Sequence, residues 1–460
     1  MGPARWESVK LQFRPLYVVL VAALLVVSLS AGARAANPRV AATVPAAGDG
    51  AVDPGLGEIR VTFDQAMDPA SVSFVTLGSG FPQVTGQPYW VDDTTIALPV
   101  RLEPDTGYWL LVNSPSFQGF RNRSGEPAVP RLLAFWTAGG EHSEEPGDAE
   151  RERNQRAYEQ VVELMTIFYS YKDRLGIDWA ERLAAAREWL LSSRNDLMFG
   201  VRLVEVLAPA MDAHLAVGVA GPDGNVVTLP TRWAMAPANY NLQAVLAKLT
   251  NVKQWSSAVV SGEAGDIGYV LIGGWVPDAD VAIEAVAAMS HKAAIIVDVR
   301  PNSGGDERIA QRVAGCFTDE AVDYALSLTL DPETLEFTRL ETRTFQPNPA
   351  CGPYAGEVVV LTGPQVMSSN EAFLLMMRAA GATLIGAPSF GSSGNPQPRQ
   401  LANGLVLYVP QWQALDLDGR LVEGNGVTPD IVLDVAPDRF ASADPVFDAA
   451  VALVSRQERD

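Results

Sequence analysis

Lysine is scarce in this chain, and its absence from the C-terminal third limits which residues can act as a base there. Only five lysines occur among the 460 residues, and the last is Lys292. Histidine is rarer still, with His142, His214 and His291. A catalytic site built from residues beyond Lys292 therefore has no lysine to use as a general base, and the three histidines become the candidates.

Cysteine is almost absent. The chain has only Cys316 and Cys351, and two thiolates alone are too few to hold a zinc ion. In an oxidising compartment the pair can form a single disulfide, whereas two buried free thiols are an equally good interpretation of the sequence. We predict the disulfide, because the sequence also predicts export.

Long apolar runs are missing except near the N-terminus. Arg5, Lys10 and Arg14 precede the uncharged run Leu16–Ser30, and small residues at 33–35 follow it. This run of 15 residues is short for a membrane-spanning helix, so we predict a cleaved signal peptide over residues 1–35. No cysteine follows the run to accept a lipid. We therefore expect an exported protein, periplasmic or extracellular, without a membrane anchor after cleavage.

Positive charge is under-represented, because 34 Lys and Arg stand against 54 Asp and Glu, a formal net charge of −20. The predicted signal peptide carries +3, so the exported chain would carry −23. A chain this acidic repels nucleic acid and anionic membranes, and neither is expected as a partner. Its length and 48% hydrophobic content support two or three domains with cores of their own.

Residues 37–138 contain short β-type runs separated by proline, glycine and aspartate, without a helical period. The pattern predicts an all-β sandwich. The segment resembles a bacterial Ig-like domain at Val44-Pro45, Asp49-Gly50, Val61–Asp64 and Met67–Pro69. That resemblance implies an accessory or spacer module. The acidic stretch 139–153, which contains His142, is predicted to be a linker.

Residues 154–210 predict a helical cap of two or three helices. Asp178 and Glu181 form a capping pattern, and apolar residues recur at helical spacing after them. The predicted core extends over residues 211–460. Within it, strands and helices alternate from the strand Ile267–Ile272 and the helix Asp278–Met289 onward. Such alternation predicts an α/β core with a largely parallel sheet, whose functional loops lie at the carboxyl ends of the strands.

The stretch Gly356–Phe373 is the centre of this core. A valine-rich strand is followed by a Gly-Pro break and by Ser368, close to the start of a helix. Because free N–H groups at a helix N-terminus stabilise negative charge, Ser368 is the candidate nucleophile and the N–H of Ser369 a candidate oxyanion donor. The simpler interpretation is that one of these serines only caps the helix.

Gly304 and Gly305 follow another buried strand, Ala293–Val299, which comes earlier in the chain. Without side chains, they let backbone N–H groups approach a substrate carbonyl, although a tight turn alone also explains them. For the base, His142 lies in the predicted linker and His291 at the wrong end of the central strand, which leaves His214. A lone histidine beside an apolar strand is more often structural.

Three ordered motifs, with Asp212-x-His214 after the cap, resemble the tail-specific (C-terminal processing) protease superfamily. The motifs are Asp298-x-Arg300-x-Asn302-x-Gly304-Gly305, Val366–Glu371 and Glu423–Ile431. The resemblance extends over roughly residues 154–455. It implies a crotonase-like, ClpP-type α/β peptidase core, and oxyanion donors from the Gly304-Gly305 turn and from Ser369.

The superfamily has two catalytic arrangements, and this chain resembles the tricorn-core-like branch. The other branch places its lysine in a Gly-Lys-Gly loop, where this chain has Gly391-Ser392-Ser393-Gly394. The tricorn-like branch implies Ser368 as nucleophile, His214 as base and Glu423 as the carboxylate that orients the histidine. On its own, Glu423 has the pattern of an exposed turn residue. One departure is Ala213, because that branch has a serine directly before the histidine.

The resemblance implies a serine peptidase acting on peptide or protein substrates through a Ser-His-Glu site, with neither a metal nor an organic cofactor. The alternative is a non-catalytic member that binds an apolar ligand or a peptide. Too few residues separate His214 from the strand at Ile267 for an inserted PDZ domain. A carboxylate beside His214 is expected to raise its pKa above the ordinary value of about 6.5.

Overall fold

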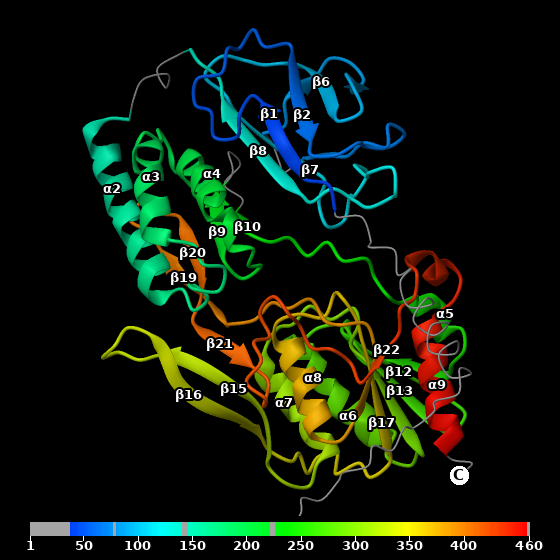
Figure 1. The fold of residues 1–460 in the computed structure, drawn as a ribbon. Helices are drawn as coiled ribbons and strands as arrows, with labels where there is room; N and C mark the ends of the chain where they lie inside the picture. The colour runs from blue at the N-terminus through cyan, green and yellow to red at the C-terminus, as the bar shows by residue number, and fades with distance from the viewer. Residues whose placement is uncertain (1–36, 77–79, 140–145, 221–225, 458–460) are drawn as a thin grey trace, which may run out of the picture.

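The computed structural model describes residues 37–76, 80–139, 146–220 and 226–457. The predicted signal peptide and His142 lie outside these ranges. In Figure 1 the N-terminal β domain lies at the top beside the helices α2–α4, and the larger α/β part lies below them. This arrangement confirms the predicted fold class of an all-β sandwich, a helical cap and an α/β core.

The N-terminal domain consists of two sheets that face each other. One has the order β1-β2-β6-β4 with β5 beside β6, and the other has the order β3-β7-β8. Their inward residues alternate, as in β2, where Ile59, Val61 and Phe63 are buried. The strands are β1 Val40–Val44, β2 Glu58–Phe63, β3 Phe74–Thr76, β4 Gln83–Val84, β5 Tyr89–Trp90, β6 Thr95–Arg101, β7 Gly107–Val112 and β8 Arg131–Trp136.

The cap begins earlier than the sequence predicted. Helix α2, Asp148–Glu163, starts inside the predicted linker, where the N–H of Gly147 donates to Oε2 of Glu150 at 2.9 Å. Asp178 caps the next helix as predicted, accepting from the N–H of Glu181 at 2.8 Å. The remaining elements are η2 Leu164–Phe168, α3 Trp179–Leu191, α4 Asp196–Leu207 and η3 Ala208–Ala210.

A small sheet lies beneath these helices, in the order β10-β9-β20-β19. It joins distant parts of the chain, because two strands precede the core and two come from its C-terminal half. Helix α4 packs on β9, where Gly200 has no side chain to separate it from Val219. The strands are β9 Ala216–Ala220, β10 Val226–Pro230, β19 Pro396–Gln400 and β20 Val406–Pro410.

The Ig-like domain packs directly on the cap. Trp109 and Leu132 belong to the same buried cluster as Leu203 of α4. The Arg202 Nε donates to the carbonyl of Gly48 at 3.1 Å. Burial of apolar area across this contact makes the domain part of one body with the cap.

The core is a seven-stranded sheet in the order β11-β12-β13-β14-β17-β18-β22. The run from β13 to β22 is parallel, β12 is antiparallel to β13, and β11 is antiparallel to β12, so β12 alone runs against the others. Helices α6, α7 and α8 cover one face, and α5 and α9 cover the other. The strands are β11 Thr250–Gln254, β12 Val259–Ala264, β13 Ile267–Ile272, β14 Ala294–Asp298, β17 Glu357–Thr362, β18 Thr383–Gly386 and β22 Ile431–Val432.

One helix of this core differs slightly from prediction. The predicted helix Asp278–Met289 is divided into a 3₁₀ turn, η4 Pro277–Val281, and α6 Ala282–Ala288. The other helical elements are α5 Leu242–Leu246, α7 Glu307–Ala314, η5 Gly315–Phe317, α8 Ser369–Ala379, η6 Pro437–Ala441 and α9 Pro445–Gln457.

The two functional loops meet because their strands are neighbours. Strands β14 and β17 are parallel, and Asp298 pairs with Leu361 near the carboxyl ends of both. The chain leaves β14 toward Gly304-Gly305 and leaves β17 toward Ser368. Register alone therefore brings the glycine turn beside the serine.

A hairpin leaves the core between α7 and β17. Strands β15 Val322–Leu330 and β16 Phe337–Phe345 form it, and β21 Trp412–Leu415 pairs with β15. In the structure a disulfide joins Cys316 and Cys351, the two ends of this excursion. The structure thus has the predicted disulfide at these positions and not the two free thiols that the sequence also allowed.

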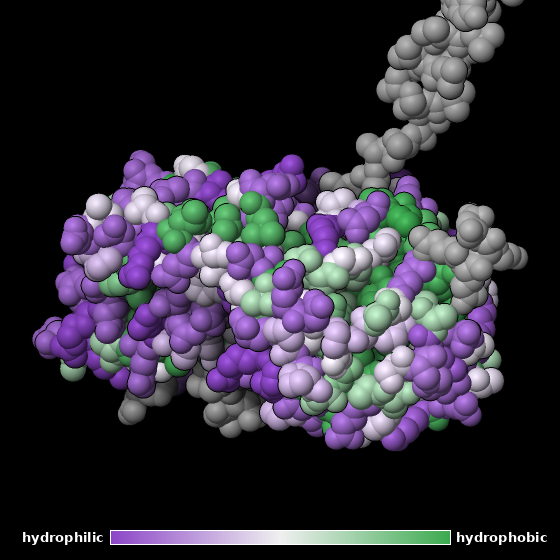
Figure 2. Space-filling view, turned by 90° about the horizontal axis from the view of Figure 1, so that it is seen from below, coloured by the Kyte–Doolittle hydropathy of each residue, from purple (hydrophilic) through white to green (hydrophobic). Residues whose placement is uncertain are grey.

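Figure 2, which views the molecule from below, shows hydrophilic side chains over most of one half and hydrophobic patches interspersed on the other. Among the residues that the structure describes, no helix is both long and apolar enough to cross a membrane.

Candidate functional site

Ser368 occupies a strained turn between β17 and α8. Its φ of 58° and ψ of −135° are unusual for a residue with a side chain, and such strain is held only where the surroundings enforce it. Its N–H donates to the carbonyl of Ser392 at 2.8 Å. Its Oγ makes no capping hydrogen bond to α8. The simple capping interpretation of Ser368 is therefore wrong, and the hydroxyl points elsewhere.

The hydroxyl points to His214. The distance from Ser368 Oγ to His214 Nε2 is 3.1 Å, which is hydrogen-bond distance. His214 lies just before β9, where a buried carboxylate fixes the backbone: Asp212 Oδ1 accepts from the N–H of His214 at 2.8 Å. The Oδ2 of Asp212 accepts from the hydroxyl of Tyr169 at 3.0 Å. The cap thus holds the histidine that faces the core serine.

Ser392 makes the second contact of the imidazole, and the sequence analysis missed it. Its Oγ lies 2.8 Å from His214 Nδ1. When Nε2 accepts the Ser368 proton, Nδ1 must carry hydrogen, so it donates to Ser392 Oγ. The sequence does show Ser392 in the Gly391–Gly394 loop, at the place where the other branch carries its lysine. Ser392 provides a hydroxyl beside the histidine where Ala213 provides none.

A buried glutamate holds the loop that carries Ser392. Glu371, in the first turn of α8, is 1% exposed. Its Oε1 accepts from Ser389 Oγ at 2.5 Å and from the N–H of Gly391 at 2.7 Å, and its Oε2 accepts from the N–H of Ser392 at 2.9 Å. Burial raises the pKa of Glu371 to about 7, against the opposing effect of these donors.

Glu423 is buried at 1% exposure and is not the exposed turn residue that its local pattern suggests. Its Oε2 accepts from the N–H of Ser393 at 2.8 Å. Its Oε1 has no hydrogen-bond partner within the described part of the chain. The direct contact to His214 expected of Glu423 is instead made by Ser392.

Asp212, His214 and Glu423 nevertheless form a compact group, with one ligand-type atom of each within 4.8 Å of the others. Burial, with the charge of Asp212, raises the pKa of Glu423 well above 4.5. Burial also raises the pKa of Asp212. Such a trio resembles a metal-binding set, but both oxygens of Asp212 and both nitrogens of His214 already have partners.

The pKa of His214 moves in the direction opposite to our expectation. Burial of the ring lowers it below the ordinary 6.5, and this effect outweighs the Asp212 carboxylate, which raises it. Desolvation penalises the charged imidazolium more than one nearby carboxylate stabilises it. His214 is consequently neutral, and able to accept a proton, over a wider pH range than a free histidine.

Two of the three predicted oxyanion donors are available. The N–H groups of Gly305 and Ser369 have no acceptor among the described residues, whereas the N–H of Gly304 donates to Asn302 Oδ1 at 2.8 Å. The prediction of Gly304 as a donor is therefore wrong, because a side chain two residues earlier occupies its N–H. A Cβ on Gly304 would lie 2.7 Å from Ser368 Cβ, so this glycine makes room for the serine.

Gly305 needs the freedom of glycine for another reason. Its φ is 133°, and a Cβ there would lie 2.2 Å from the carbonyl oxygen of Trp275. Trp275 is 1% exposed and packs on Phe373, with ring centroids 4.7 Å apart. It is therefore a core residue that supports the turn. Ser369 Oγ donates to the carbonyl of Gly305 at 2.8 Å and links the two donors.

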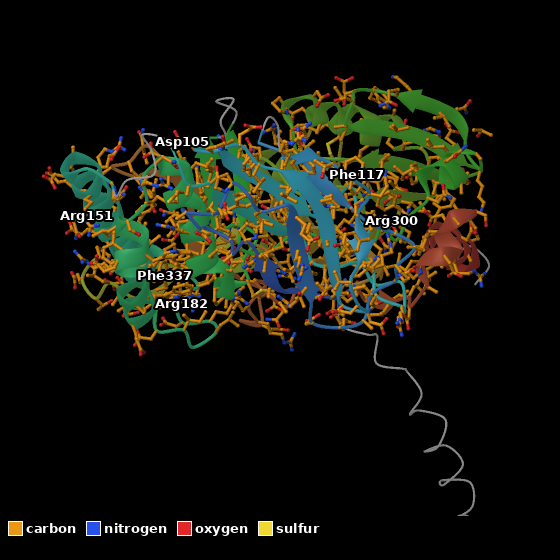
Figure 3. The ribbon with its side chains drawn as sticks, turned by 90° about the horizontal axis from the view of Figure 1, so that it is seen from above. Asp105, Phe117, Arg151, Arg182, Arg300 and Phe337 are labelled. Carbon is orange, nitrogen blue, oxygen red and sulfur yellow. A yellow bond between two sulfur atoms is a disulfide. The ribbon has the colours of Figure 1, made fainter. Side chains whose placement is uncertain are left out.

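A buried ion network lies beneath the glycine turn. Arg300 is fully buried, donates to both oxygens of Asp298 at 2.9 and 2.7 Å, and donates to Asp444 Oδ1 at 2.8 Å. Figure 3 shows Arg300 close to the C-terminal helix α9. The guanidinium donates to both carboxylates, and the hydroxyl of Tyr269 donates to Asp298 Oδ2 at 2.8 Å, so hydrogen bonds compensate the burial of these charged groups. The network fixes the strand end from which the turn begins.

Ser368 and His214 line a pocket of about 740 Å³. Ser369, Ser327 of β15 and Trp412 of β21 line it as well. The pocket thus combines a serine, a neutral histidine and two unpaired N–H groups. That set suits nucleophilic attack on a carbonyl and stabilisation of the resulting oxyanion.

Comparison with known proteins agrees with this geometry. Residues 266–433 match peptidase family S41, and residues 34–122 match a bacterial Ig-like domain. A Parabacteroides merdae protein assigned as a peptidase is 22% identical, with a TM-score of 0.55 over 66% of this chain and 96% of its own. This likeness shows a shared fold.

Two further solved structures are more distant. The photosystem II D1 C-terminal processing protease is 15% identical, with a TM-score of 0.42 over 63% of this chain and 94% of its own. The tricorn protease is also 15% identical, with a TM-score of 0.45 over 90% of this chain and 55% of its own. The family matches thus cover residues 266–433 for peptidase family S41 and residues 34–122 for a bacterial Ig-like domain, and the S41 match supports a peptidase function.

Proposed function

We propose that this protein is an exported serine peptidase in which Ser368 is the nucleophile and His214 the general base. The observation that carries the proposal is the 3.1 Å contact between Ser368 Oγ and His214 Nε2, beside the unpaired N–H groups of Gly305 and Ser369. A capping serine or a structural histidine would need neither feature.

The reaction follows from these positions. His214 Nε2 takes the Ser368 proton as Oγ attacks the scissile carbonyl, and the N–H groups of Gly305 and Ser369 bind the oxyanion. The imidazolium then gives its proton to the leaving amine, and the C–N bond breaks to leave an acyl-enzyme. Water, activated by His214, hydrolyses the ester and restores Ser368.

Ser392 and Glu423 act through His214. Ser392 holds the tautomer with hydrogen on Nδ1, as required for Nε2 to accept a proton. Positive charge on His214 favours ionisation of the nearby buried carboxylates, so Glu423 and Asp212 stabilise the imidazolium as it forms. Glu423 thus completes a Ser-His-Glu site by charge, with Ser392 making the direct contact.

Ser368→Ala should abolish reaction with a fluorophosphonate probe, because only an activated serine attacks the phosphorus. Gel fluorescence after labelling measures this, and the thermal unfolding temperature checks that the variant folds. Ser369→Ala, which keeps its backbone N–H, is the matched control and should still label. Equal labelling of wild type and Ser368→Ala would place the nucleophile elsewhere. Failure of both to label, with binding of an apolar ligand or peptide, would favour a non-catalytic function.

Activity should rise with pH through an inflection below 6.5, because the base works when neutral and burial lowers its pKa. Asp212→Asn removes the charge that raises this pKa, so the inflection should fall further. The profile of kcat/KM against pH on a fluorogenic peptide measures both. Tyr169→Phe removes only the hydrogen bond to Asp212 and should leave the inflection in place. A wild-type inflection above 6.5 would contradict the assignment.

Ser392→Ala should reduce kcat about 10- to 100-fold with little change in KM. The reason is that a buried Nδ1–H left without an acceptor costs about 1–3 kcal/mol. Ser393→Ala is the control, because its N–H still serves Glu423 while its Oγ contacts only Tyr171 at 2.8 Å. Steady-state kinetics of both variants decide the matter. Near-wild-type kcat for Ser392→Ala would remove its positioning role.

Export is the remaining part of the proposal, and the N-terminal sequence pattern and the Cys316–Cys351 disulfide support it. The protein recovered from its native host should begin near Ala36, lie outside the cytoplasm and contain no free thiol. N-terminal sequencing and thiol titration of the unreduced, unfolded protein measure these properties. A chain that kept Met1 and two free thiols would refute export.

A further inference from the structure

A second cavity, larger than the catalytic pocket, lies where the Ig-like domain, the cap and the core meet. Its volume is about 1060 Å³, and neither Ser368 nor His214 lines it. Its walls come from all three parts of the chain and mix apolar with charged side chains. The apolar ones include Val129, Met235 and Phe390, and the charged ones include Arg131 and Glu205. This volume is at the upper limit for small-molecule pockets, which are about 300–1,000 Å³.

One wall is an extended segment, residues 231–240, between β10 and α5. Figure 1 shows it crossing beneath the Ig-like domain toward α5. From 232 to 240, and apart from Pro237, none of its backbone N–H groups has an acceptor within the described ranges. Backbone groups of this kind are normally paired, so an extended run of open donors resembles the free edge of a sheet.

The segment is nevertheless fixed at both ends. Arg232 donates to the carbonyls of Phe390 and Gly391, both at 2.9 Å. Near the other end, Asn239 Nδ2 donates to the carbonyl of Thr362 at 2.9 Å, and the Asn239 carbonyl accepts from Arg300 at 2.9 Å. A fixed, open edge loses little entropy when a second extended chain pairs with it.

The same cavity touches the loop that orients the catalytic histidine. Phe390 lines the cavity, and the Arg232 guanidinium lies 3.9 Å from the centre of its ring. Two residues later Ser392 contacts His214 Nδ1. Ser389 and Phe390 therefore line the cavity, and Ser392 of the same loop holds the imidazole.

We propose that this cavity binds an extended segment of a polypeptide by strand addition to residues 232–240. That this polypeptide is the substrate rests on the proposed function, whereas the binding itself does not. Backbone pairing would supply affinity for many sequences, and the mixed walls would accept apolar and polar side chains alike. The site would hold a chain outside the pocket in which its peptide bond is cut.

The test measures binding to the full chain carrying Ser368→Ala, so that cleavage plays no part. The probe is fluorescein-labelled, reduced and carboxymethylated α-lactalbumin, an unfolded polypeptide, and fluorescence anisotropy gives its Kd. Ala238→Trp and Ala436→Trp fill the cavity from opposite walls and should each raise Kd at least about tenfold, a change of about 1.4 kcal/mol. Ala234→Trp is the matched control, since Ala234 is exposed and does not line the cavity.

Hydrogen exchange supplies a second measurement on the same parent. Bound probe should slow amide exchange across 232–240, because open N–H groups become paired. Absence of probe binding, unchanged Kd in both cavity variants, or an equal loss in Ala234→Trp would each overturn the proposal. Loss of fluorophosphonate labelling in the wild type would instead count against the catalytic proposal and leave the binding result standing.

Discussion

The site depends on one buried carboxylate, Glu371, and the three donors around it. A carboxylate this deep in the protein is costly unless hydrogen bonds compensate, and here they all come from residues 389–392. The same hydrogen bonds also hold the loop in place, because residues 389–392 belong to neither a helix nor a strand. By fixing that loop to the first turn of α8, Glu371 places Ser392 beside His214 and Ser393 beside Glu423. The nucleophile and its supporting loop are thus positioned by the same helix.

The buried Arg300 network holds the end of β14, from which the glycine turn beside Ser368 begins. It ties the end of β14 to Asp444, just before α9, and to the backbone of Asn239. The glycine turn, the C-terminal helix and the segment 231–240 therefore share one charged centre. In Figure 3 Arg300 lies well away from Arg151 and Arg182 of the cap, so the core and the cap are organised by different interactions.

Much of this arrangement was predictable because it depends on local pattern. Alternating apolar runs located β13, β14 and β17, and the strand–turn–helix pattern located Ser368. The scarcity of histidine selected His214 by elimination. Ser392 was not predictable in this way, since its contact joins loops separated by 178 positions in the chain. The loss of Gly304 as a donor depended on which way the Asn302 side chain turned. The lowered pKa of His214 depended on burial, which only the packed structure reveals.

The disulfide encloses a segment that contributes a wall to the catalytic pocket but none of the catalytic atoms. Ala325, Ser327 and Thr329 of β15 lie between Cys316 and Cys351, whereas Ser368, His214 and Ser392 lie outside. The disulfide joins the two ends of this excursion, and at the tip of the hairpin Leu335 and Glu336 contact Lys172 of the cap. Substitutions or insertions in the hairpin can therefore change which side chains fit the pocket without moving the reacting groups. Selectivity and reactivity reside in separable parts of one chain, so this scaffold can acquire new substrates while its chemistry stays the same.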